Sequence, residues 1–211
     1  MMSEPSHTEQ KTVGTPYDAL ILAGGRGSRL EGRDKGWVMH QGLPLIEHAL
    51  ACLAAQTTIP TRVLISANRN IDAYKQTGRT VVTDERENFA GPLAGVEAGL
   101  MRCKRNNLLV IPCDTPLLPP DLYERLERAL TENSSALAAY AVTHDGPQPL
   151  CCLLRPAAAG WLAKYLDEQK ASAIKWLEQI GAQAVHFENA EAFSNLNTME
   201  MFQSLKTKGQ A

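Results

Sequence analysis

Glycine and basic side chains are concentrated in residues 22–36, which read Leu-Ala-Gly-Gly-Arg-Gly-Ser-Arg-Leu-Glu-Gly-Arg-Asp-Lys-Gly. Glycines allow successive backbone N–H groups to converge on an anion. Arg26, Arg29, Arg33 and Lys35 supply charge that neutralises a chain of phosphates. The alternative is a plain turn whose basic side chains are only solvated. Because turns seldom concentrate four cations, the sequence favours a polyphosphate-binding loop.

Two common phosphate motifs do not fit this stretch. A dinucleotide fingerprint needs G-x-G-x-x-G, and Leu30 occupies the place of its third glycine. A P-loop needs Gly-Lys followed by Ser or Thr, whereas Lys35 follows Asp34 and precedes Gly36. The stretch therefore predicts a phosphate loop of another kind.

Two aspartates follow apolar runs that are typical of strands. Asp114 follows residues 108–111, and Asp84 follows residues 80–83. Since α/β sheets bind ligands at the carboxyl ends of their strands, both carboxylates are candidates to face a ligand. Mg²⁺ prefers one or two carboxylates together with phosphate oxygens, so Asp114 is the predicted metal ligand. The alternatives are a capping role for Asp114 and turn formation by Asp84.

The elements that must position these residues alternate between strand and helix, which predicts an α/β layered sheet. Short branched runs predict strands at 17–23, 62–67, 80–83, 108–112, 136–142, 150–154 and 185–187. Apolar residues at helical spacing predict helices from Pro44, over 93–103, from Pro119 or Pro120 onward, and over 157–166, 172–179 and 198–205.

Composition bounds the function classes. The 211 residues are 44% hydrophobic and 21% charged, as expected of a globular protein. A formal net charge of −2 favours neither a nucleic-acid polymer nor an anionic membrane as partner. The five cysteines show no metal-ligand spacing, which indicates reduced thiols. The first sixteen residues are polar and lack a secretory signal, so we expect a flexible tail at 1–16, one domain at 17–211 and a cytoplasmic location.

A family resemblance becomes specific when the motifs are combined. They are the loop 22–30 with Asp34-Lys-Gly36, Gly91-Pro-Leu-Ala-Gly95, Pro112-Cys-Asp-Thr-Pro116 and Asn195-Leu-Asn-Thr198. Over about residues 17 to 207 the chain resembles the molybdenum cofactor guanylyltransferases, the MobA family. The resemblance implies a three-layer, Rossmann-like nucleotidyltransferase fold with a mostly parallel central sheet. It also implies transfer of GMP from GTP to molybdopterin-bound molybdenum, with Mg²⁺ as cofactor and with transient contacts to other proteins of molybdenum-cofactor biosynthesis by a monomer.

The resemblance also assigns roles to individual residues. The GTP phosphates would be held by Leu22, Ala23, Gly24, Gly25, Arg29 and Lys35. Asp84 would bind the nucleotide, and Asp114 would hold the metal, so that Arg29, Lys35 and Asp114 carry catalysis. Ser66 stands where the family has an asparagine that contacts the nucleobase. The choice between guanine and cytosine in the donor nucleotide therefore stays open. Asn195 and Asn197 would lie near the metal or cofactor, with turn formation as the alternative.

Two rival functions remain at this stage. The first keeps the chemistry but changes the substrates, pairing CTP with molybdopterin or another nucleotide with a sugar phosphate. The second is a noncatalytic module that binds GTP and signals to a partner. Release of pyrophosphate separates the second rival from every transferase.

Overall fold

A seven-stranded sheet forms the centre of the computed structural model, which describes residues 15–24, 34–84, 86 and 91–196. Its strand order is β5-β4-β1-β6-β8-β7-β9. The strands are β1 (Asp18–Leu22), β4 (Arg62–Ser66), β5 (Thr80–Val82), β6 (Leu108–Pro112), β7 (Ala138–Thr143), β8 (Gly146–Leu154) and β9 (Gln183–His186). Only β8 runs opposite to the other six strands of this sheet, which confirms the mostly parallel sheet.

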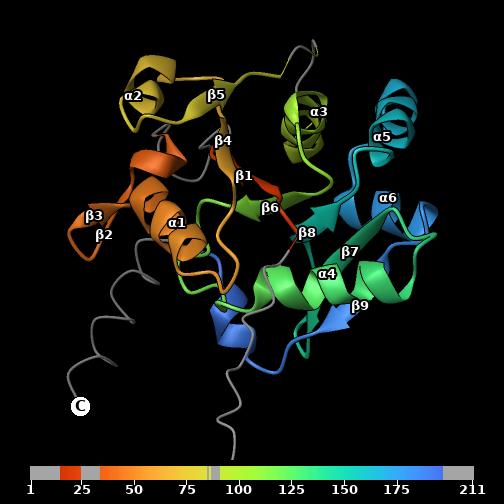
Figure 1. Ribbon diagram of the computed structural model, residues 1–211. Helices are drawn as coiled ribbons and strands as arrows, with labels where there is room; N and C mark the ends of the chain where they lie inside the picture. The colour runs from red at the N-terminus through yellow and green to blue at the C-terminus, as the bar shows by residue number, and fades with distance from the viewer. Residues whose placement is uncertain (1–14, 25–33, 85, 87–90, 197–211) are drawn as a thin grey trace, which may run out of the picture.

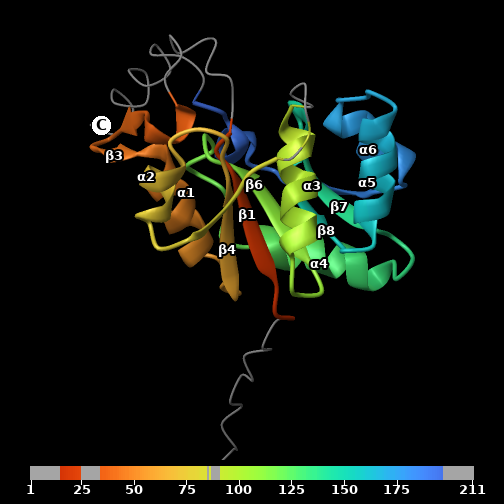
Figure 2. The same ribbon diagram turned by 90° about the horizontal axis from the view of Figure 1, so that it is seen from above.

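Helices cover both faces of this sheet, because successive side chains of a buried strand point to opposite sides. Ala19 and Ile21 of β1 belong to the core shared with α1 (Leu45–Ala54) and α4 (Leu122–Glu132). Leu20 and Leu22 belong to the core shared with α3 (Pro92–Arg102), α5 (Ala158–Asp167) and α6 (Ala173–Gln179). Figures 1 and 2 show the two helical layers on either side of the strands. The predicted three-layer α/β fold is confirmed.

Short elements escaped the sequence prediction because they span too few residues to show a period. They are the single turns η1 (Lys35–Trp37) and η2 (Ala190–Phe193), the strands β2 (Met39–His40) and β3 (Leu43–Pro44), and the helix α2 (Ile71–Lys75). The turn between β2 and β3 places Gln41 and Gly42 at φ 46° and 85°. The expected helix at 198–205 lies outside the described residues.

Strand β8 departs most from expectation, since it begins at Gly146 rather than at 150. The adjacent residues Cys151 and Cys152 of this strand belong to the cores on opposite faces of the sheet, as expected for neighbouring residues of a strand. All five cysteines are free thiols. None of the described helices is both long enough and apolar enough to cross a lipid bilayer.

Candidate active site

The carboxyl ends of β1 and β6 lie at a topological switch point. The chain leaves β1 through α1 to reach β4 on one side, and α3 later leads it to β6 on the other side. In open α/β sheets such a point leaves a crevice outside the strand ends. The backbone fixes this edge: the Ala23 and Gly24 N–H groups both donate to the Ser66 carbonyl at 2.9 Å, and the Cys113 N–H donates to the Leu22 carbonyl at 3.1 Å.

The Asp-Lys-Gly turn is anchored to the segment around α2. Asp34 Oδ1 accepts hydrogen bonds from the Gly36 N–H at 3.2 Å and from Tyr74 Oη at 2.5 Å, and Oδ2 accepts one from Asn70 Nδ2 at 3.0 Å. A Cβ on Gly36 would lie 2.2 Å from Tyr74 Oη, so glycine is required by close approach. Burial, and after it the hydrogen bond to Asp34, raises the pKa of Tyr74, which keeps its hydroxyl protonated as a donor. Lys35 therefore leaves a fixed turn.

Lys35 and Asp114 meet across the crevice. The Lys35 Nζ forms an ion pair with Asp114 Oδ2, and the two side chains are 26% and 5% exposed. The Asp114 carbonyl accepts a hydrogen bond from the Leu196 N–H at 2.9 Å, which ties the end of the described chain to the same residue. A buried carboxylate is thus held beside a cation. Its place just beyond the end of β6 is the position that the sequence predicted for Asp114.

A cleft of about 480 Å³ opens over this pair. Six residues that the sequence singled out lie together in its wall: Leu22, Ala23, Gly24, Lys35, Asp114 and Asn195. The other lining residues are Pro92, Pro112, Thr115, Pro147, Gln148, Pro149, Leu150 and Cys151. The predicted Gly25 and Arg29, and with them Asn197, lie outside the described residues.

Ser66 and Asp84 are not among the described residues that line the cleft. Ser66 is buried at the end of β4, and a Cβ on Gly95 of α3 would lie 2.3 Å from its Oγ, so the two residues pack closely. The Asp84 N–H donates to Asn68 Oδ1 at 3.2 Å, beyond the outer strand β5. Contacts of Ser66 and Asp84 with a nucleotide stay predictions.

Sequence reasoning missed the wall that β8 contributes, residues 147–151. Pairing between β6 and β8 reaches only Val110 and Cys152, so the two strands separate where the cleft opens. The signal that could have located this wall is the pair of prolines around Gln148, since proline interrupts regular pairing. Burial raises the pKa of the Cys151 thiol well above its usual value, which makes it a poor nucleophile.

A metal ion at this site would need ligands from the bound nucleotide and from water as well as from the protein. Within the described part of the chain, no group of three or more His, Cys, Asp or Glu side chains is placed to hold a metal ion. Among the described residues that line the cleft, Asp114 is the one carboxylate. One carboxylate with phosphate oxygens and water is the ligand set that Mg²⁺ commonly takes beside a nucleotide.

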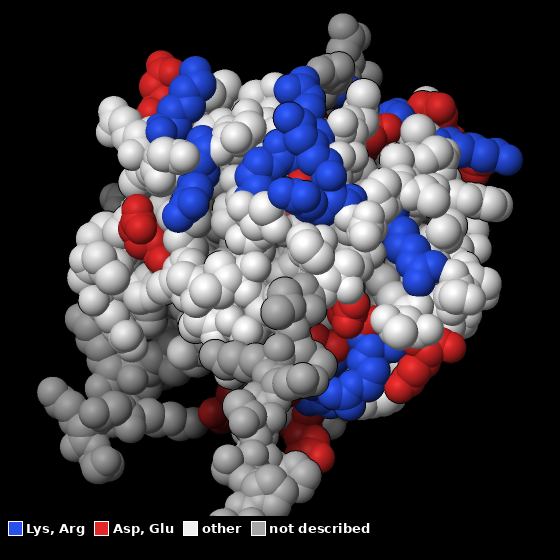
Figure 3. All heavy atoms as spheres, in the orientation of Figure 1, with Lys and Arg blue, Asp and Glu red and all other residues white. Residues whose placement is uncertain are grey.

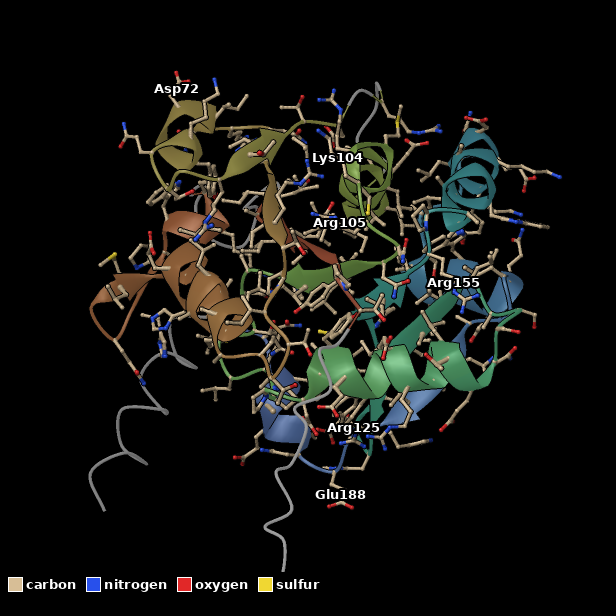
Figure 4. The ribbon with its side chains drawn as sticks, in the orientation of Figure 1. Asp72, Lys104, Arg105, Arg125, Arg155 and Glu188 are labelled. Carbon is tan, nitrogen blue, oxygen red and sulfur yellow. The ribbon has the colours of Figure 1, made fainter. Side chains whose placement is uncertain are left out.

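The cleft is distinct from the basic surface at the other end of the sheet. Figure 3 shows Lys and Arg side chains gathered on the face that contains the amino ends of the strands. Lys104 and Arg105, labelled in Figure 4, belong to the loop that precedes β6. Asp114 follows β6 at its opposite end.

Comparison with known proteins gives the same fold and adds the family. Residues 19–184 match the model of the MobA-like NTP transferase domain. A relative from Cupriavidus metallidurans, named molybdenum cofactor guanylyltransferase, is 42% identical over 197 residues, covering 90% of this chain and 96% of that protein. A relative of the same name from Bordetella petrii is 39% identical over 194 residues, with 90% and 97% covered.

Solved structures resemble the whole sheet. Molybdopterin-guanine dinucleotide biosynthesis protein A from Archaeoglobus fulgidus has a TM-score of 0.67 and 22% identity, with 90% of this chain and 99% of that chain covered. A CMP:2-keto-3-deoxy-manno-octonic acid synthetase complexed with CTP has a TM-score of 0.70 and 12% identity, with 93% and 98% covered. These likenesses are evidence for the fold. The match over residues 19–184 and the relatives near 40% identity establish that the chain belongs to the MobA-like NTP transferase family.

Proposed function

We propose that this chain is a molybdenum cofactor guanylyltransferase that transfers GMP from GTP to the terminal phosphate of molybdenum-loaded molybdopterin and releases pyrophosphate. The observation that carries the proposal is the Lys35–Asp114 pair, held at the switch point in a cleft lined by Leu22, Ala23 and Gly24. The names of the curated relatives support the choice of guanylyl group and acceptor.

The reaction needs placement more than proton transfer. A phosphate nucleophile is already anionic near neutral pH, so no general base is required of the chain. It must be set in line with the α-phosphorus, and charge on the leaving pyrophosphate must be neutralised. Lys35, fixed by the Asp34–Tyr74 contact, is placed to neutralise phosphate oxygens. The predicted ligands Gly25 and Arg29 would add N–H groups and a guanidinium to the same task.

Asp114 fits the role of a Mg²⁺ ligand. Its side chain is 5% exposed, lies in the cleft wall and forms an ion pair with Lys35. Mg²⁺ bound there would supply charge neutralisation on the triphosphate. Asp114 and Lys35 would then hold the donor from both sides, with Lys35 turning from the carboxylate toward phosphate.

The base end of the donor belongs on the β4–β5 side of β1. Asp84 and Ser66 follow or end these two strands, and the resemblance assigns both to the nucleotide. Ser66 packs against Gly95, so its hydroxyl has less reach than an asparagine amide would have. Guanine selection would rest on Ser66 together with neighbouring polar groups such as Asn68.

Release of pyrophosphate tests the proposal directly. The full chain is mixed with molybdenum-loaded molybdopterin and Mg²⁺ together with either GTP or CTP, and a parallel sample contains a chelator. Turnover with GTP that the chelator abolishes is the expected result. Turnover with CTP alone would overturn the guanine assignment, and binding of GTP without pyrophosphate release would favour the sensor module.

The remaining expectations accompany this function. We propose one catalytic domain over residues 17–211, acting as a monomer in the cytoplasm with transient contacts to proteins that deliver and collect the cofactor. Light scattering of the purified chain at working concentration checks the monomer. A mass of twice the chain would contradict it.

A further inference from the structure

The wall that β8 contributes to the cleft is built by a break in the sheet. On β7, Tyr140 is paired with Cys152 and the next residue, Ala141, is paired with Gln148. Residues 149–151 of β8 therefore have no partner on β7, and the pairing with β6 has ended at Cys152. Freed from both neighbours, this bulge is turned into the cleft instead of continuing the sheet.

Two prolines flank the polar residue that comes directly before this bulge. Pro147 and Pro149 have fixed φ and no N–H to donate, so neither can vary its backbone widely, and of the two only Pro147 is paired with β7, opposite Val142. Between them stands Gln148, half-buried and part of the cleft wall. Its amide makes no hydrogen bond to another described residue. A stiff backbone holds that amide ready for a ligand with little loss of freedom on binding.

The two walls of the cleft differ in chemistry. The side formed at the ends of β1 and β6 carries Lys35 and Asp114, which suits phosphates and a metal ion. The β8 side carries no formal charge: its proline, leucine and cysteine residues are apolar, and the Cys151 thiol is protonated. Among the described residues that line that side, Gln148 has the one side chain that offers both a hydrogen-bond donor and an acceptor. Apolar faces with one amide suit a flat heterocycle, whose faces stack while its edge is hydrogen-bonded.

Position decides which heterocycle this is. With the reacting phosphates between β1 and β6, the nucleoside of the donor extends toward β4 and β5, as proposed above. Strand β8 lies next to β6 on the opposite side. The group that reaches β8 is therefore the acceptor.

We propose that the Pro147–Gln148–Pro149 segment, at the edge of the bulge, is the wall that contacts the ring of the acceptor, with the Gln148 side-chain amide hydrogen-bonded to the edge of the pterin-type heterocycle. This inference rests on the proposed function. It assigns to Gln148 the selection of the acceptor and leaves donor binding to the opposite wall. An amide recognises adjacent N–H and C=O or ring-nitrogen groups, which a 2-amino-4-oxo ring edge displays.

Variants at Gln148 test the assignment. In Gln148→Ala the KM for molybdenum-loaded molybdopterin should rise about tenfold, as loss of a paired amide contact predicts, while the KM for GTP stays within about twofold. Gln148→Glu keeps the shape but loses the N–H donors, and should show the same selective rise. Gln179→Ala, an exposed glutamine on α6, is the matched control and should change neither constant.

Inhibition by free ring compounds separates ring recognition by Gln148 from a merely structural role of this residue. Pterin, with a 2-amino group, should inhibit the wild type competitively against the acceptor and more strongly than lumazine, which has a second oxo group there. Gln148→Ala should lose most of this preference. An unchanged acceptor KM and an intact preference would overturn the inference, as would a rise confined to the KM for GTP.

Failure of the proposed function has a different signature. If the wild type releases no pyrophosphate with any nucleotide and this acceptor, the proposed function is wrong, and the acceptor wall falls with it. If the wild type turns over normally and the Gln148 variants match it, the function stands and only the role of Gln148 is rejected.

Discussion

Two acid–base pairs lie at opposite ends of the central sheet. At the amino end of β1, Asp18 pairs with Arg62, and their side chains are 1% and 28% exposed. Beyond the carboxyl end of β6, Asp114 pairs with Lys35, and the values are 5% and 26%. By burial and charge alone, the two pairs are nearly equivalent.

Their surroundings separate them. Asp18 Oδ2 accepts hydrogen bonds at 2.8 Å from both Arg62 Nη2 and the Lys104 N–H, so it joins β1 and β4 to the loop before β6. Asp114 and Lys35 instead line the cleft. A buried ion pair becomes a candidate for chemistry when it borders space that a substrate can enter, and otherwise it fixes the positions of chain segments. The predictions below separate these two roles.

The largest effect is expected from Asp114→Asn. Loss of the carboxylate should lower kcat by about 10²–10³ if it holds the metal that stabilises the transition state. The melting temperature should change little, because the partner Lys35 is partly hydrated. Steady-state kinetics with GTP and the acceptor measure this, and a change in KM with normal kcat would contradict the metal role.

The next effect concerns the turn that places Lys35. In Gly36→Ala the new methyl group would displace the Tyr74 hydroxyl, which a Cβ would meet at 2.2 Å. Moving Lys35 by about 1 Å should reduce kcat/KM by about 10–100-fold. Tyr74→Phe removes the hydroxyl and its bond to Asp34 without adding atoms, so its loss should be smaller. Equal losses in the two variants would show that the methyl group is not the cause.

At the other end, Asp18→Ala should act on stability. Removing the carboxylate takes the acceptor away from both the Lys104 N–H and the Arg62 guanidinium, which costs about 1–3 kcal/mol. For a chain of this size that lowers the melting temperature by about 2–12 °C. Turnover measured well below the transition should stay within about twofold of wild type. A large loss of kcat at such a temperature would erase the distinction between the two pairs.

The smallest effect is a difference in thiol reactivity between the two ends. Burial raises the pKa of Cys103, near Asp18, and raises that of Cys151, in the cleft wall, well above the usual value. Cys103 is partly exposed while Cys151 is buried, so iodoacetamide at pH 8 should label Cys103 first. Mass spectrometry of the timed reaction reads the order. Earlier labelling of Cys151 would mean that the cleft wall opens readily.

Local chemistry explains what the sequence could reveal. A run of β-branched and other apolar residues predicts a strand, and the Gly24 or Asp114 that follows it within a few residues marks the end that faces a ligand. The strands and these site residues could therefore be predicted from local sequence. The role of Tyr74 could not be predicted, because only the tertiary fold brings it against Gly36, which lies 38 positions away in the sequence. The β8 bulge was also hidden, since it depends on how β7 and β6 pair with the strand. The orientation of Ser66 toward Gly95 likewise follows from helix packing.

The bond from the Leu196 N–H to the Asp114 carbonyl has a consequence for biosynthesis. A chain is synthesised from its amino terminus, so β1, β4, β5 and β6 leave the ribosome before the later strands. Asp114 nevertheless gains its last backbone partner only after residue 196 has followed. All strands of the sheet are therefore synthesised before the segment that bonds to Asp114. A chain truncated before residue 196 would keep most of the core but would lack this contact at the cleft.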